Sequence, residues 1–223
     1  MSRALASEFI GTFILVFAGC GAVVASADVG SIGLVGIALA FGIAVAVVVA
    51  ATAHVSGAHI NPAVTVSLLL AGKIKAGKAG AYILVQLAGA ALAGLALRLL
   101  FPASSWQPVH LGATALAPHV STLAGVGIEA VLTFFLVFTI FGTAVDPRGP
   151  GAAGAAFAIG LVVTMDIIVG GGFTGGSMNP ARSFGPALVS GTWGDWWVYL
   201  VGPLVGGAIA SLVYSKVLLK RPA

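Results

Sequence analysis

The tripeptide Asn-Pro-Ala occurs twice in this chain of 223 residues, at Asn61-Pro62-Ala63 and at Asn179-Pro180-Ala181. Asparagine is a preferred helix N-cap, and proline suits the first helical turn because its missing N–H would lack a partner there anyway. Each copy therefore predicts a short helix, at about 62–71 and 180–189. A helix N-terminus carries about half a positive charge. Two such ends facing each other would repel cations, while the asparagine amides could donate hydrogen bonds to a neutral, polar molecule.

The composition indicates which kind of protein surrounds these two motifs. Charged residues make up only 7% of the chain and apolar residues 59%, and the mean hydropathy is +1.12. Typical soluble domains contain about 25% charged residues, so this chain has too few charged residues to form the surface of a water-soluble domain. An ordinary cytosolic enzyme, a disordered tail and a DNA-binding domain are excluded, and no nucleic-acid partner is expected. The remaining class is an all-α membrane protein with several spans.

Apolar stretches long enough to cross a bilayer as helices define the topology. We predict six spans, at about 5–27, 32–55, 79–101, 120–143, 151–172 and 196–218. With both termini in the cytoplasm, most of the ten basic residues fall on that side: Arg3, Lys73, Lys75, Lys78, Arg148, Lys216, Lys220 and Arg221. Only Arg98 and Arg182 do not. The positive-inside rule therefore predicts a multi-pass protein of the cell (inner) membrane with cytoplasmic termini.

The two halves of the chain resemble each other. Glu8-Phe9-Ile10-Gly11-Thr12-Phe13, near the start of the first span, parallels Glu129-Ala130-Val131-Leu132-Thr133-Phe134 near the start of the fourth. We expect a single channel domain over 1–223, with one repeat at about 1–101, a second at about 120–223 and an outer loop at 102–119. Because each repeat has three spans, the halves must be inverted, which puts a site at the midplane.

This geometry has a consequence for protons. The two Asn-Pro-Ala segments would enter the membrane from opposite sides and bring their half-helix N-termini together. A water molecule that accepts hydrogen bonds from both asparagine amides must turn its own hydrogens away. That orientation would interrupt a proton-conducting chain of waters, so water could pass without charge.

The motifs resemble those of the major intrinsic protein (aquaporin) family over nearly the whole chain. The matching segments are Ser7-Glu8-Phe9, His54 to Thr65 with the first Asn-Pro-Ala, and Asn179-Pro180-Ala181-Arg182-Ser183-Phe184-Gly185-Pro186. The resemblance implies six spans plus two re-entrant half-helices, one pore in each subunit and a homotetramer. It also implies a passive water channel with no cofactor, no metal and no catalytic residues.

The resemblance further implies an outer selectivity constriction formed by Phe41, Ile167, Gly176 and Arg182. Strict water channels of the family usually carry histidine at the position of Ile167, and glycerol channels usually carry a bulky aromatic residue at that of Gly176. The set found here is similar to the plant vacuolar branch, some of whose members pass ammonia. Isoleucine and glycine make the opening wider and less polar on one wall, so ammonia or other very small neutral solutes become candidates. In that branch a histidine of the outer loop can join the constriction, and either His110 or His119 could do so here.

Two matched carboxylates, Glu8 and Glu129, lie within the predicted spans. We interpret both as acceptors for the backbone N–H groups of the re-entrant loops, which lipid cannot satisfy. A proton relay in a coupled transporter is the alternative. For His54 and His59, ring packing with hydrogen bonds to the loop is favoured over pH gating. The sequence suggests no partner for Asp166.

Three other functions remain to be compared with a water channel. A facilitator for a larger neutral solute such as glycerol would share the same fold. A proton-coupled transporter would use Glu8 or Glu129. A membrane enzyme is disfavoured because no histidine and carboxylate cluster is arranged for catalysis or metal binding. Cys20 is the only cysteine, which excludes an intrachain disulfide.

Overall fold

The structure, a computed structural model, describes residues 1–219; Lys220 and Arg221, which entered the argument about orientation, lie outside the described residues. The described chain is helical, and no β-strand occurs within it. Within residues 1–219, six apolar helices are long enough to cross a membrane, two of them together with the extensions named next: α1 (Ser2–Val29), α2 (Gly33–Ser56), α4 (Ala76–Leu100), α6 (Thr122–Ile140), α7 (Gly151–Thr174) and α9 (Val198–Val213). Two π-helical turns, η2 (Phe141–Val145) and η3 (Tyr214–Leu218), extend α6 and α9. The observed spans end within three residues of the predicted ones.

Two shorter helices begin at the Asn-Pro-Ala motifs. They are α3 (Pro62–Leu70) and α8 (Pro180–Ser190), each capped by the preceding asparagine and each with proline in its first turn. Their bounds agree with the predicted half-helices to within one residue. The prediction of an all-α membrane protein with six spans and two half-helices is therefore confirmed.

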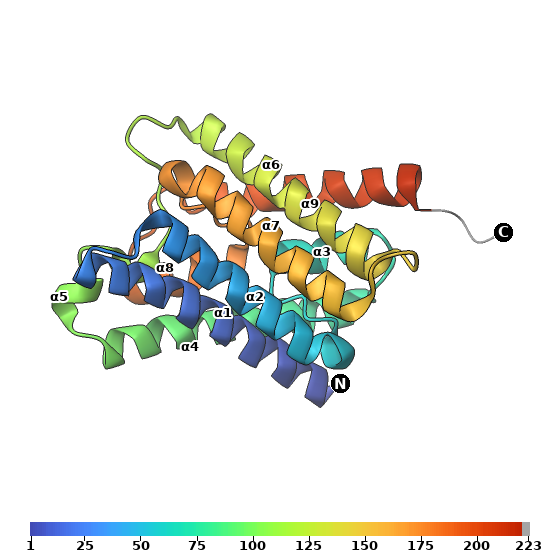
Figure 1. Cartoon of the computed structure of the whole chain (residues 1–223), viewed down its shortest axis with the longest axis horizontal. Helices are drawn as coiled ribbons and strands as arrows, with labels where there is room; N and C mark the ends of the chain where they lie inside the picture. Colours follow the sequence, from blue (N-terminus) through green and yellow to red (C-terminus); the bar gives the residue numbers. More distant parts are fainter. Residues whose placement is uncertain (220–223) are drawn as a thin grey trace.

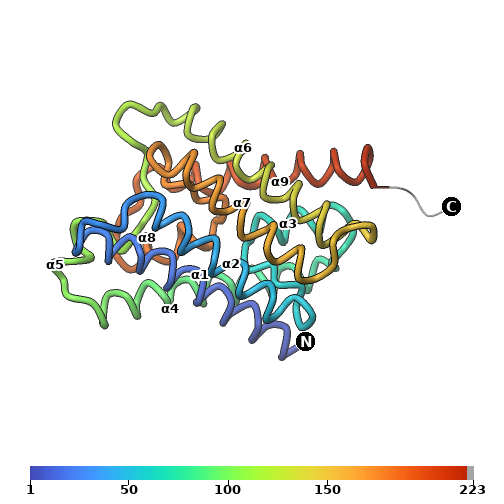
Figure 2. The backbone as a smooth tube through the Cα atoms, viewed as in Figure 1, coloured from blue at the N-terminus to red at the C-terminus, as the bar shows by residue number. Residues whose placement is uncertain are grey.

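The long helices run roughly side by side, and the chain termini lie at the same end of the molecule (Figure 1). We call this the terminal end. The opposite end contains α5 (Ala103–Trp106), which lies in the connection between α4 and α6. The backbone trace in Figure 2 shows α3 toward the terminal end and α8 toward the opposite end.

Each half-helix packs against the third span of the other repeat. α3 contacts mainly α9, and α8 contacts mainly α4. Within each repeat, the first span packs along the third, as α1 with α4 and α6 with α9. Because the half-helices are exchanged in this way, neither repeat could bury its own re-entrant segment alone.

The two repeats also meet where α2 crosses α7. A Cβ atom added to Gly42 would lie 2.5 Å from the Gly160 carbonyl oxygen, and one added to Gly160 would lie 2.6 Å from the Gly42 carbonyl oxygen. These distances are shorter than any real Cβ contact. Glycine at both positions thus lets the two backbones touch, as small residues do at membrane helix crossings.

Candidate pore and its constriction

A cavity of about 460 Å³ runs through the middle of the helix bundle, between the two repeats. Toward the terminal end its wall includes His54, His59, Thr143 and Asp146. Both half-helix asparagines line its middle. Further along, the wall contains all four residues expected at the outer constriction: Phe41, Ile167, Gly176 and Arg182. The remaining wall is largely aliphatic, so the few polar groups facing the cavity are the ones that can bind a solute.

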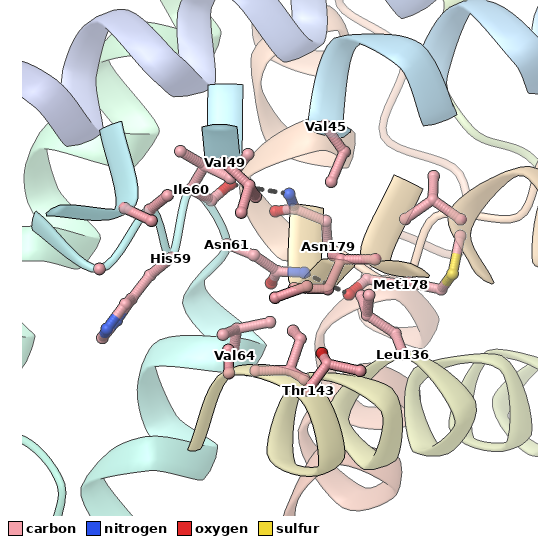
Figure 3. Close-up of a pocket in the computed structure, with 18 of the residues that line it drawn as sticks. Val45, Val49, His59, Ile60, Asn61, Val64, Leu136, Thr143, Met178 and Asn179 are labelled. Atoms are coloured by element: carbon pink, nitrogen blue, oxygen red, sulfur yellow. Dashed lines mark hydrogen bonds between the residues drawn. The ribbon is translucent and has the colours of Figure 1, made fainter. Parts of the chain in front are cut away.

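Asn61 and Asn179 are held in a crossed arrangement (Figure 3). The Asn61 Nδ2 donates to the Met178 carbonyl oxygen at 2.9 Å, and the Asn179 Nδ2 donates to the Ile60 carbonyl oxygen at 3.0 Å. Each side-chain oxygen caps its own half-helix, accepting from the N–H of Ala63 at 2.8 Å or of Ala181 at 3.0 Å. An amide nitrogen carries two hydrogens, so a second hydrogen on each asparagine remains to donate into the cavity.

Glu8 binds the first re-entrant loop from α1. Its carboxylate accepts from the backbone N–H groups of His59, at 2.9 Å, and Ile60, at 2.6 Å. The side chains of Ser56 and Gln86 donate to it as well, at 2.7 and 2.8 Å. Glu8 is fully buried, and its four donors are what allow a carboxylate to remain there.

Glu129 binds the second re-entrant loop in the same way from α6. It accepts from the N–H groups of Ser177, at 2.9 Å, and Met178, at 2.8 Å, and from the Thr174 hydroxyl at 2.7 Å. Met178 has a positive φ of 54°, and Ile60 in the first loop has one of 44°. Residues other than glycine rarely occupy this region, and at both positions the N–H group of the residue donates to the buried carboxylate.

Arg182 stands at the outer end of the cavity. Its Nη1 donates to the Gly112 carbonyl oxygen at 2.7 Å, and its Cζ lies 4.7 Å from the centroid of the Phe41 ring. Gly176 lies against the wall formed by Ile167, since a Cβ added to it would be 3.2 Å from the Ile167 Cα. The four residues therefore line the same cavity as two contacting pairs, the Arg182 guanidinium with the Phe41 ring and Gly176 with Ile167.

The Gly112 carbonyl is a contact that the sequence analysis did not identify. It belongs to η1 (His110–Gly112), where three successive residues have positive φ values of 48°, 58° and 73°. Leu111 is fully buried between α1, α4 and α8, and the Cys20 Sγ lies 3.7 Å from the Gly112 oxygen. The buried Leu111 side chain holds this turn of the outer loop in place, and the Gly112 carbonyl then points toward Arg182. No local pattern around Gly112 signals this role.

Of the four histidines, His54 and His59 line the cavity and the two in the outer loop do not. His110 and His119 are exposed and do not line the cavity; the His119 ring packs edge-on against Phe173. His59 packs edge-on against Tyr82, with ring centroids 5.1 Å apart, and its Nδ1 lies 3.2 Å from the Thr65 hydroxyl.

Asp166 is fully buried, and neither carboxyl oxygen has a hydrogen-bond partner among the described residues. Over the same part of the chain, no group of three or more His, Cys, Asp or Glu side chains is arranged to hold a metal ion.

A cluster of hydrogen-bonded polar side chains, which we call the latch, lies at the terminal end beside the cavity. Asp146 accepts from the Arg148 backbone N–H and Nε, both at 2.9 Å, and from the Tyr214 hydroxyl at 3.2 Å. Arg148 also donates to the Leu218 carbonyl oxygen at 2.9 Å, which joins the α6–α7 connection to η3, the extension of α9. The hydrogen bonds from Arg148 hold the pKa of Asp146 well below its usual range.

Comparison with known proteins agrees with this architecture. The family model described as "Major intrinsic protein" matches residues 1–214. Aquaporin TIP4-4 of Zea mays is 48% identical over 219 residues, covering 96% of this chain and 85% of the relative. Aquaporin TIP4-1 of Arabidopsis thaliana is 46% identical over 224 residues, covering 99% and 88%.

A solved structure, the aquaglyceroporin from Plasmodium falciparum, superposes with a TM-score of 0.88 at 28% identity, covering 97% of this chain and 96% of that one. The chain therefore belongs to the major intrinsic protein family and is a passive water channel, not an enzyme.

Proposed function

We propose that water crosses this channel in single file along the central cavity, past Asn61 and Asn179 at the midplane and through the ring of Phe41, Ile167, Gly176 and Arg182. The observation that carries the proposal is the crossed pair of asparagine bonds to Met178 and Ile60. These bonds fix the two amides beside the cavity, next to two positive helix ends. A water molecule at that point accepts from both amides and cannot pass a proton along the file.

Arg182 supplies the second barrier in this proposal. Its guanidinium is buried, is fixed by the Gly112 carbonyl and adds a positive charge against cations and protons. Replacing Arg182 with valine should preserve water permeability and admit protons or larger solutes. The test is osmotic swelling of proteoliposomes by stopped flow, run beside a proton-flux assay with an entrapped pH dye. Unchanged selectivity in the Arg182→Val channel would contradict the assigned constriction.

We further propose that ammonia and other very small neutral solutes pass through the same ring. Ile167 offers no hydrogen-bonding group and Gly176 has no side chain. That wall therefore binds water weakly, and a small uncharged solute can replace water there. Introducing a polar side chain with Ile167→His should lower ammonia flux relative to water flux. The measurement is the ammonia-to-water permeability ratio of the purified protein, and an unaltered ratio would remove the argument from Ile167.

Glycerol is the second candidate solute. The structural similarity to a protein named an aquaglyceroporin favours testing it, and the missing side chain at Gly176 leaves room on one wall. Swelling of the same vesicles in a glycerol gradient distinguishes a water and ammonia channel from a glycerol facilitator. Glycerol permeability that equals or exceeds that of ammonia would favour the glycerol facilitator.

The orientation proposed for the chain has both termini in the cytoplasm of a cell (inner) membrane. It is supported by basic residues at the terminal end: Arg3 in the first turn of α1, Lys73 and Lys75 in the α3–α4 connection, and Lys78 in the first turn of α4. The similarity to plant TIP aquaporins makes a vacuolar membrane the alternative, with the termini again facing the cytoplasm. Protease digestion of a C-terminal tag in sealed vesicles tests the orientation.

We also propose that the chain is a single channel domain over 1–223 and that four copies associate, each with its own pore. The exchange of half-helices between repeats supports the single domain. The apolar residues exposed on the outer faces of α1 and α2 (among them Ile10, Ile14, Ile43 and Val47) offer surface for neighbouring copies or lipid. Chemical cross-linking of the purified protein should give a ladder that ends at four subunits.

A further inference from the structure

Gly19, on α1, contacts the aromatic member of the constriction from behind. A Cβ atom added to Gly19 would lie 2.1 Å from Cε1, 2.2 Å from Cδ1 and 2.5 Å from Cζ of the Phe41 ring. The Cδ1–Cε1–Cζ edge of the ring thus lies against the α1 backbone, in space that a single methyl group would fill. Gly19 is buried and does not itself line the cavity.

The Phe41 ring is enclosed on its other sides as well. Its side chain is buried, and the Arg182 guanidinium lies over its face, with Cζ 4.7 Å from the ring centroid. The open space beside the ring is the cavity, which both Phe41 and Arg182 line. A ring pushed away from α1 must therefore move into the passage, toward the arginine. Close-packed surroundings transmit such a displacement instead of absorbing it.

We propose that Gly19 is a positioning residue that sets the width of the constriction by seating the Phe41 ring against α1. The inference rests on the proposed constriction at Phe41 and Arg182. It assigns part of the channel's selectivity to a residue that no solute touches. A side chain at position 19 would narrow the passage, and glycine there keeps it open.

The decisive variant is Gly19→Ala, because alanine adds only the clashing methyl group and is a better helix former than glycine. One methylene in a close-fitting hydrophobic pocket changes discrimination by about 10–200-fold, and a single added methyl group is expected at the lower end of that range. We therefore expect Gly19→Ala to lower water permeability per channel by about tenfold and to lower the ammonia-to-water ratio further.

The matched control is Gly21→Ala on the same helix, where an added Cβ would meet only the Leu97 Cδ2 at an ordinary 3.4 Å. It should keep wild-type permeability.

The experiment compares six proteins in proteoliposomes by stopped flow, with channel number normalised: wild type, Gly19→Ala, Gly21→Ala, Phe41→Ala, and each glycine variant combined with Phe41→Ala. If Gly19 acts through the ring, adding Gly19→Ala to Phe41→Ala changes neither water permeability nor the ammonia-to-water ratio. Wild-type permeability of Gly19→Ala, or an equal loss in the Phe41→Ala background, would overturn the inference.

The variants also distinguish failure of the Gly19 proposal from misfolding and from an error in the proposed constriction. If Gly19→Ala alone cannot be recovered folded, the double variant with Phe41→Ala should be recovered, since it has no ring to displace. Failure of the double variant, with Phe41→Ala itself folded, would also overturn the inference. If Phe41→Ala leaves permeability and selectivity at wild-type values, the proposed constriction is wrong, which is a different result from the failure of Gly19.

Discussion

Glu129→Gln separates a structural carboxylate from a proton relay. Glu129 accepts from two loop N–H groups and one hydroxyl, with Oε1 serving Ser177 and Thr174 and Oε2 serving Met178. Glutamine retains one oxygen, so its NH₂ group must face a donor that the carboxylate satisfied. At least one buried donor then loses its acceptor, which costs about 1–3 kcal/mol.

That cost predicts a measurable loss of stability. For a chain of this size, each kcal/mol shifts Tm by about 2–4 °C, so we expect Glu129→Gln to unfold about 2–12 °C below wild type. Cys20 is the only cysteine and is fully buried, so a thiol-reactive dye reports unfolding without any added label. Asp28→Asn is the matched control, since Asp28 is exposed and accepts from the Ser105 hydroxyl at 2.9 Å, outside the re-entrant loops.

The same substitution should reduce water permeability. A glutamine that keeps its oxygen on Ser177 and Thr174 leaves the Met178 N–H without an acceptor, and Met178 presents the carbonyl that holds the Asn61 amide at 2.9 Å. A coupled transporter makes the opposite prediction, a stable protein whose saturable flux no longer depends on a proton gradient. A Glu129→Gln protein with wild-type Tm and wild-type water permeability would refute the reasoning that this carboxylate holds the loop.

Two further predictions concern the latch and the helix crossing. Because Arg148 lowers the pKa of Asp146 in the folded state, that carboxylate's contribution to stability is fully present above the ordinary aspartate pKa of about 4 and is lost as pH falls through the lower folded value. Asp146→Asn should therefore lower Tm by a constant amount from neutral pH down to about pH 5, with the difference closing under stronger acid; a gap that widens on acidification would contradict this. Gly42→Ala would place a Cβ 1.9 Å from the Thr164 hydroxyl, and overpacking of about 1–3 kcal/mol should lower Tm by about 2–12 °C. Gly80→Ala, whose added Cβ meets no atom within 4 Å, should leave Tm unchanged or raise it.

Much of the fold follows from local properties of the chain. Six apolar stretches of bilayer length predict the spans because the bilayer core imposes one length on all of them. Asn61-Pro62 and Asn179-Pro180 predict the starts of α3 and α8, since capping and the proline φ angle act within a few residues. The odd number of spans in each repeat then requires the inverted arrangement.

The structure of the outer loop could not be predicted from local sequence signals. Residues 102–119 were expected only as a connection, yet they contain α5 and η1. The left-handed backbone of Leu111 has no signature in residue type, because leucine rarely adopts it. Leu111 is fully buried, and its turn packs against α1, α4 and α8, which are far apart in the sequence.

The sequence by itself determined the membrane class, the two half-helices and the polar residues from which a pore could be built. Only the tertiary structure decided how those residues are held: Asn61 by the Met178 carbonyl, Arg182 by that of Gly112, and the Phe41 ring by the bare backbone of Gly19. Each of these contacts joins segments from different helices or loops. Residue type and spacing report the hydrogen-bonding capacity and size of a side chain, whereas its partner depends on which backbone the packing of the whole bundle brings beside it.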